Sequence, residues 1–289
     1  MTNSASVGVI IPTFNRGLAV LSTLHRLAQC DPPAAEIWIH IDAADGVLER
    51  ELARQFPAVG VLTSAARLGP GGGRDRCLAA CKMPYVFSFD DDSYPVDADI
   101  FSRVENIFAL TPSAGVIGAT IWHRHESPIP RNVVLARVPS FTGCGHAIRL
   151  AAYRQVRGYL PRPNAYGLEE TDLSLQLFAA GWHIYRSGEL RVFHDTELSH
   201  HQSAEITSAV VANIGLFTFL NYPMIGWARG VLQLGNAVVF ALRMGRFRGI
   251  ASGLLRLPFD CYRYRRYRSP IAWSIVRAFL SFRRTGLAP

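Results

Sequence analysis

The sequence predicts an α/β protein with a mostly parallel sheet and helices on both of its faces. From residue 7 to residue 194, short apolar runs alternate with stretches of helical period, as in consecutive strand and helix units. Three aspartates, Asp90, Asp91 and Asp92, directly follow the apolar run at residues 85–89. Because such sheets bind ligands at the carboxyl ends of their strands, the aspartates place negative charge at a binding edge.

The first half of the chain supplies four strand and helix units. Residues 7–12 form a continuous apolar run typical of a buried strand, and leucines at positions 18, 21, 24 and 27 give the next segment one apolar helical face. The other elements are expected in this order: strand 36–41, helix 47–56, strand 59–62, a flexible glycine turn at 69–73 before a helix, and strand 85–89, which Pro95 ends.

The second half continues this pattern as far as the C-terminal region. The expected elements are a helix from 100 to about 110, a strand at 116–122, a loop at 123–131, an apolar turn and helix after 141–145, a helix at 173–180 and a last strand region between 183 and 194. We place a domain boundary after residue 204. It separates an α/β domain over residues 1–204 from a helical C-terminal region over residues 205–289.

The net charge of +8 is distributed unevenly along the chain. Residues 241–289 hold eleven arginines and one acid, a net charge of +10, whereas residues 1–240 hold 19 basic and 21 acidic groups. Basic charge confined to one end argues against nucleic-acid binding and for a local contact with an anionic surface. The five scattered cysteines form no disulfide framework, and the N-terminus does not resemble a signal peptide, so we expect a protein of the reducing cytoplasm.

The aspartate run predicts a divalent cation site. Asp90 and Asp92 lie two residues apart, and carboxylates this close repel one another unless a cation or a proton lies between them. Their hard oxygen atoms favour Mg²⁺ or Mn²⁺ over zinc. A solvated acidic turn is the alternative interpretation of three acids taken alone.

Five segments in a fixed order resemble a known family. They are residues 9–16, Asp42, residues 68–75 with Leu-Gly and Arg-Asp at their two ends, residues 89–92 with Pro95, and residues 167–173 with 180–182. In order and spacing, across residues 7–201, they resemble the inverting glycosyltransferases of family 2. The resemblance implies the GT-A fold of nucleotide-diphospho-sugar transferases, a Rossmann-like mixed sheet. It also implies metal-dependent transfer of a sugar to a hydroxyl acceptor.

The resemblance also implies catalytic and metal-binding residues. Asp90 and Asp92 would bind the metal, with His194 completing the site; a neutral surface histidine is the alternative for His194. Glu170 matches the position of the catalytic base, and Glu169 that of an acceptor-binding residue. This chain has glutamate where aspartate is more usual, so the assignment between the two stays open. Charges favoured by the dipole at a helix start are the alternative for both glutamates.

Donor binding is implied for residues at the strand ends and in nearby loops. Thr13 and Asp42 are expected to recognise the nucleotide base and ribose, with a plain loop aspartate as the alternative for Asp42. Arg74 is expected to reach the diphosphate or the aspartate loop. Its place in the glycine run, together with Pro70, argues against a dinucleotide fingerprint. The full predicted set is Pro12, Thr13, Asn15, Arg16, Asp42, Gly69, Arg74, Asp90, Asp91 and Gly143.

The C-terminal region predicts contact with a membrane surface. Residues 209–227 contain no charge, but Asn213, Asn221 and Pro223 interrupt them, a pattern closer to interfacial than to spanning helices. Residues 259–268 interleave aromatics with arginines, which suits the headgroup depth of an anionic membrane. We therefore expect a cytoplasmic protein, peripheral on the inner face of the cell membrane. Packing on the α/β domain or on a second subunit of a homo-oligomer, and a true span, are the alternatives.

Substrates and function classes are predicted less narrowly. The expected donor is a UDP-, GDP- or dTDP-sugar, and the expected acceptor is a glycan or a lipid-linked intermediate. A phosphatase of the haloacid dehalogenase type would use Asp90 as nucleophile. That family expects Thr or Val where this chain has Tyr94, and it carries its motif on the first strand. A degenerate nucleotide-binding module is disfavoured by the two intact carboxylate sites.

Overall fold

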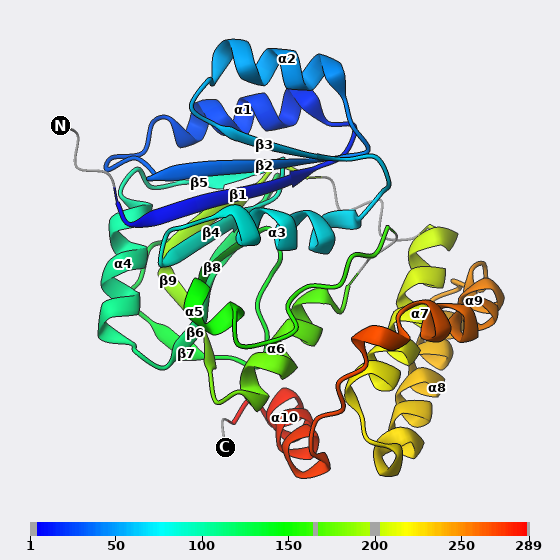
Figure 1. Cartoon of the computed structure of the whole chain (residues 1–289). Coiled ribbons are helices and arrows are strands. Elements are labelled where there is room, and N and C mark those ends of the chain that lie inside the picture. The colour runs from blue at the N-terminus through cyan, green and yellow to red at the C-terminus, as the bar shows by residue number, and fades with distance from the viewer. Residues whose placement is uncertain (1–4, 164–166, 197–202, 288–289) are drawn as a thin grey trace.

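The computed structural model describes residues 5–163, 167–196 and 203–287. A nine-stranded sheet runs through the α/β domain in the order β3-β2-β1-β4-β8-β6-β9-β5, with β7 paired to β9 (Figure 1). The strands are β1 (Val7–Thr13), β2 (Glu36–Asp42), β3 (Gly60–Ser64), β4 (Tyr85–Phe89), β5 (Ser93–Pro95), β6 (Ala114–His123), β7 (Leu135–Arg137), β8 (Gly145–Arg149) and β9 (His183–His194).

Helices cover both faces of this sheet, as predicted (Figure 1). The first face carries α1 (Gly17–Leu27), α2 (Gly46–Gln55) and α4 (Ile100–Leu110), and the second carries α3 (Gly69–Ala80), α5 (Leu150–Tyr153) and α6 (Glu169–Ala179). Along β1, Val9 and Ile11 point into the first core and Ile10 into the second, and all three are fully buried. This alternation follows from the period of two of a strand.

The sheet is mixed, and only part of it is parallel. β3, β2, β1 and β4 run parallel, as the alternation of strands and helices predicts. β8 runs antiparallel to both of its neighbours, β4 and β6, and β5 and β7 run antiparallel to β9. The apolar turn expected after residues 141–145 is therefore wrong, since the chain forms β8 there. Ala147 and Ile148 are buried on opposite faces of the sheet, which requires an extended chain.

The C-terminal region is helical, as expected, and packs against the α/β domain (Figure 1). Its α-helices are α7 (Ala204–Asn221), α8 (Trp227–Arg243), α9 (Ile250–Arg263) and α10 (Trp273–Thr285). Leu175 of α6 lies in one apolar cluster with Phe217 of α7 and Phe279 of α10. A buried ion pair of 3.0 Å joins Arg162 to Asp260 of α9. These contacts fasten the loop before α6 to the C-terminal helices.

Two stretches of the C-terminal region are long and apolar enough to cross a membrane by length and composition alone. In Ala204–Asn221, 56% of the window is buried inside the protein, against 17% in Met224–Arg243. Arg268, expected among the membrane-facing arginines of residues 259–268, instead donates hydrogen bonds to the carbonyls of Phe219 and Tyr222. It therefore fastens the chain after α9 to the end of α7.

Candidate active site

A cavity of about 610 Å³ opens at the carboxyl ends of β1, β2 and β4. One wall comes from Thr13 at the end of β1 and from Asp90 directly after β4, because neighbouring parallel strands end at the same edge. The facing wall comes from Gly143 and from the first turn of α6. The lining residues are Pro12, Thr13, Phe14, Arg16, Asp42, Arg67, Gly69, Pro70, Arg74, Asp90, Asp91, Asp92, His123, Phe141, Thr142, Gly143, Cys144, Gly167, Glu169, Glu170, His194 and Thr196.

The three aspartates lie in different environments. Ser93 holds their turn, because its hydroxyl accepts from the Asp90 amide at 2.8 Å and donates to the Cys144 carbonyl at 2.6 Å. The Asp90 side chain is 31% exposed, whereas those of Asp91 and Asp92 are only 8% and 5% exposed. Asp90 is therefore the carboxylate most open to a ligand.

Arg16 joins the two buried aspartates. Its guanidinium lies 3.0 Å from Asp91 Oδ1 and 2.7 Å from Asp92 Oδ2. The second oxygen of Asp91 accepts from the Thr13 hydroxyl at 2.9 Å. Burial raises the pKa of Asp91 to about 7, against the opposing effect of the Arg16 charge. Asp91 thus uses its oxygens to hold the loop together, and it sets the position of its two neighbours.

The residues beside the aspartate loop fit a divalent cation. The pairing of β9 with β5 brings His194 to the loop, where its Nε2 lies 3.1 Å from Asp92 Oδ1. Donor atoms of Asp90, His194 and Cys144 lie within 4.8 Å of one another. Carboxylate and imidazole donors suit Mg²⁺ or Mn²⁺. The sulfur of Cys144 is a soft donor that these cations disfavour, which leaves Asp90, Asp92 and His194 as the fitting set.

Arg74 is a buried cation between the aspartate loop and α6. Its side chain is 3% exposed, forms an ion pair with Asp90 and lies 3.6 Å from Glu169 Oε2. It also donates to Ser88 Oγ at 3.1 Å and to the Gly143 carbonyl at 3.2 Å. Burial alone would lower the pKa of Arg74, but the nearby carboxylates raise it. Arg74 therefore stays charged and connects both walls of the cavity.

The glycines before Arg74 form the first turn of α3, so the flexible turn predicted at 69–73 is wrong. A Cβ on Gly71 would lie 2.7 Å from Glu169 Oε1, and one on Gly73 would lie 2.8 Å from His40 Nδ1. These distances are too short for a carbon atom. The glycines are thus required by close packing at the helix start, and Gly69 also by its φ of 71°.

Glu169 and Glu170 are the first two residues of α6, whereas the sequence suggested a helix starting later, at residue 173. The Glu169 carboxylate accepts from the Gly71 amide at 3.2 Å. The Glu170 carboxylate lies against Gly143, where a Cβ would collide with Oε1. Burial raises the pKa of both glutamates, the charge of Glu170 raises that of Glu169 further, and Arg74 opposes these effects. The pair therefore binds a proton more readily than two solvent-exposed glutamates would.

The family described as Glycosyl transferase family 2 matches residues 8–156, slightly more than half of the chain. The chain belongs to glycosyl transferase family 2. Membership of family 2 confirms the resemblance predicted from the five sequence segments. It also makes the phosphatase alternative wrong, in agreement with the position of the aspartates after β4 rather than after the first strand.

Solved glycosyltransferase structures share this fold. The mannosyltransferase PcManGT from Pyrobaculum calidifontis, in complex with GDP-Man and Mn²⁺, has a TM-score of 0.58 at 14% identity, covering 99% of this chain and 88% of its own. TarS residues 1–349 from S. aureus, in complex with UDP-GlcNAc, has a TM-score of 0.54 at 14% identity, covering 97% of this chain and 92% of its own. GalNAc-T7 with UDP, GalNAc and Mn²⁺ has a TM-score of 0.60 at 14% identity, covering 78% of this chain and 49% of its own.

At this identity the likeness shows the fold alone, which is GT-A. No curated protein sequence matches the chain.

All predicted site residues of this glycosyltransferase line the cavity except Asn15. Asn15 has a φ of 54° and is exposed, and it is not among the residues that line the cavity, so its role in donor binding stays a prediction. Asp42 does line the cavity, but its carboxylate already accepts from Ser64 Oγ at 3.2 Å and from the amides of Leu68 and Gly69 at 2.7 and 2.9 Å. One of its roughly four acceptor positions is left for a ligand.

The sequence prediction missed an aromatic and cationic pair at the same end of the cavity. The Arg67 guanidinium stacks over the ring of Phe14, 4.0 Å from its centroid. Both residues flank predicted ones, since Phe14 follows Thr13 and Arg67 precedes the Leu68-Gly69 segment. That adjacency was the available signal. It could not show that the two loops meet.

Proposed function

We propose that this glycosyltransferase moves a sugar from a nucleotide-diphosphate donor to a hydroxyl acceptor with inversion at the anomeric carbon. The observation that carries the proposal is the pair of facing walls. One wall holds the carboxylates and imidazole of Asp90, Asp92 and His194, and the other holds the buried pair Glu169 and Glu170. The similar structures that hold GDP-Man with Mn²⁺, or UDP with Mn²⁺, support a nucleotide donor and a divalent metal.

The nucleoside end of the donor is assigned to the loops after β1 and β3. The stacked Phe14 and Arg67 offer a flat surface for a base, and Thr13 and the remaining acceptor position of Asp42 offer hydrogen bonds. A UDP-, GDP- or dTDP-sugar meets these requirements. The acceptor hydroxyl then approaches from the side of α6.

The diphosphate is assigned to the aspartate loop. Asp90, Asp92 and His194 would bind Mg²⁺ or Mn²⁺, which supplies positive charge against the negative charge that develops on the leaving diphosphate. Arg16, whose side chain is 48% exposed, lies at the same loop and can contact the phosphates directly. The nearby Arg74 keeps Asp90 in place.

Glu170 is the better placed of the two glutamates for proton transfer. The amide of Gly71 and the charge of Arg74 hold Glu169, whereas the carboxylate of Glu170 lies in the cavity beside Gly143. Glu170 takes the proton of the acceptor hydroxyl while that oxygen forms a bond to the anomeric carbon. The bond from this carbon to the diphosphate oxygen breaks, and the nucleoside diphosphate leaves with the electron pair. A single displacement inverts the anomeric configuration.

Paired glutamine substitutions test this assignment. In the presence of Mn²⁺, Glu170→Gln should lower transfer by roughly 10²–10⁴ because the proton acceptor is lost. Glu169→Gln makes the same change in size and charge one residue away. It should mainly weaken acceptor binding. Binding of the nucleoside diphosphate, read as a rise in melting temperature, should persist in both variants. If Glu170→Gln left transfer unchanged and Glu169→Gln abolished it, the two roles would have to be exchanged.

A further inference from the structure

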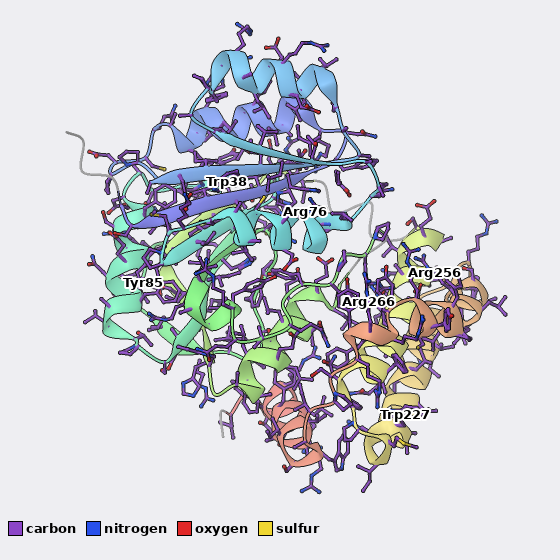
Figure 2. All side chains as sticks on the ribbon, viewed as in Figure 1. Trp38, Arg76, Tyr85, Trp227, Arg256 and Arg266 are labelled. Carbon is purple, nitrogen blue, oxygen red and sulfur yellow. The ribbon has the colours of Figure 1, made fainter. Side chains whose placement is uncertain are left out.

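Helices α8 and α9 expose an unusual number of large apolar side chains. We call this surface the α8–α9 face, and six of its residues, between 45% and 81% exposed, are Val231, Leu232, Val239, Leu255, Phe259 and Tyr262. Soluble proteins rarely leave so many neighbouring apolar groups in water, and such surfaces mark binding sites. Figure 2 places Trp227 and Arg256 on these helices, away from the sheet that carries Trp38 and Tyr85.

Both helices pack against α7. Between them lies a groove of about 200 Å³, floored by Gly215 and Phe219 of α7 and flanked by Val231 of α8 and Leu257 of α9. A Cβ at Gly215 would collide with Leu257, so α7 and α9 pack closely beside the groove. Val231 is both an exposed residue and a groove residue, whereas the exposed Leu255 and Phe259 lie two positions from the groove residue Leu257, on the outer side of α9.

The region that carries the α8–α9 face is strongly basic. Residues 205–289 hold twelve arginines and two acids, Glu205 and Asp260. Asp260 is 1% exposed and is paired with Arg162 and Arg256. Among the described residues, Arg243 and Arg248 at the α8 to α9 connection form no ion pair with any carboxylate. Arg243, Arg246 and Arg248 therefore form a basic rim at the end of the face where α8 connects to α9, and Glu205 is the exposed acid of this region.

We propose that the α8–α9 face docks on an anionic lipid bilayer, with α8 and α9 lying in the interface and the groove receiving acyl chains. Apolar side chains beside arginines and the aromatic Trp227 and Tyr262 match the layers of such a surface, from acyl chains through headgroups to phosphates. Lipid phosphates supply the negative charge that the chain itself lacks. This inference concerns a different surface from the sugar-transfer site and does not depend on the proposed reaction.

Two other occupants fit the face less well. A second copy of the chain would bring two basic rims together, which costs free energy by like-charge repulsion. Met224–Arg243 is long enough to span, but a span would place Arg229 within the membrane, because the uncharged run at residues 230–242 extends only roughly 20 Å against a hydrocarbon core of about 30 Å. Helix α7 is apolar enough, but 56% of it is buried against the rest of the protein.

Vesicle flotation of the full chain, without any sugar donor, tests the proposal. The parent should float with vesicles of equal parts phosphatidylcholine and phosphatidylglycerol, stay behind with phosphatidylcholine alone, and be released by high salt. Replacing Arg243, Arg246 and Arg248 by Gln should weaken partitioning by on the order of 100-fold, since each arginine near an anionic surface contributes about fivefold. The triple change Leu232→Ser, Leu255→Ser and Phe259→Ser should also abolish flotation.

Matched serine substitutions control for a general loss of apolar surface. Val47, Leu110 and Val133 lie on the α/β domain and are 64%, 85% and 82% exposed, so their serine variant should float like the parent. Melting curves of all variants confirm folding, and the arginine variant keeps the test valid if the apolar one unfolds. No flotation of the parent would overturn the proposal. A parent that is a dimer in light scattering, and that the apolar triple change makes monomeric, would also overturn it. So would a parent that resists alkaline extraction from vesicles, which indicates a span.

Discussion

Replacing Arg74 with Met tests whether one buried cation holds both walls of the cavity. The change removes the ion pair with Asp90, the contact with Glu169 and the hydrogen bonds to Ser88 and Gly143. Removing one partner of a buried ion pair costs about 3–5 kcal/mol, because the other charge is left uncompensated. At roughly 2–4 °C for each kcal/mol, the melting temperature should fall by about 10 °C.

Calorimetry of Arg74→Met, Glu169→Gln, their double variant and Arg76→Met separates this effect from a general loss of an arginine. Arg76→Met is the matched control, since Arg76 is an exposed residue two positions further along α3, and it should change unfolding by less than about 0.5 kcal/mol. The double variant Arg74→Met with Glu169→Gln should recover part of the loss, because it leaves one fewer uncompensated carboxylate. Equal stability of Arg74→Met and the parent, or strict additivity of the double variant, would refute the reasoning.

Two further predictions follow from the buried glutamates and from the C-terminal region. Because the folded protein raises the pKa of Glu169, it binds this proton more tightly than the unfolded chain, so ionisation destabilises the fold as pH rises above about 4.5. Chemical denaturation should therefore show Glu169→Gln gaining stability over the parent at pH 8 and little at pH 4; a gain independent of pH would contradict this. Arg268→Gln should leave the carbonyls of Phe219 and Tyr222 without their donor, cost about 1–3 kcal/mol and speed proteolysis after α9. Arg263→Gln, a change at an exposed arginine whose guanidinium lies 5.7 Å from the centroid of the Tyr264 ring, should be cleaved like the parent. Equal cleavage of both variants would show that Arg268 does not hold this segment.

The sequence predicted site residues most directly where they lie at the end of a buried strand. Apolar runs ending in Thr13 and Asp90 revealed both the parallel strands and the edge at which they bind ligands. The resemblance to family 2 added Glu169, Glu170 and His194, all of which line the cavity. Their chemical roles stay predictions.

Other features depend on contacts between distant parts of the chain. β8 lies antiparallel beside β4, with Tyr85 opposite Arg149. No local sequence pattern encodes this choice of partner strand. The approach of His194 to Asp92 likewise depends on the pairing of β9 with the three-residue strand β5. The helical glycines before Arg74 resembled a flexible turn, because glycine content indicates local freedom but not the close packing that requires it.

Transfer assays with proton NMR of the product test the central claim most directly. The parent is incubated with UDP-, GDP- and dTDP-sugars and a hydroxyl acceptor, in Mn²⁺ and again in excess chelator. We expect one donor class to release its nucleoside diphosphate only with the divalent cation, and the product to have the opposite anomeric configuration. Release that is equally fast in chelator, or a product of retained configuration, would contradict a metal-dependent displacement in this cavity.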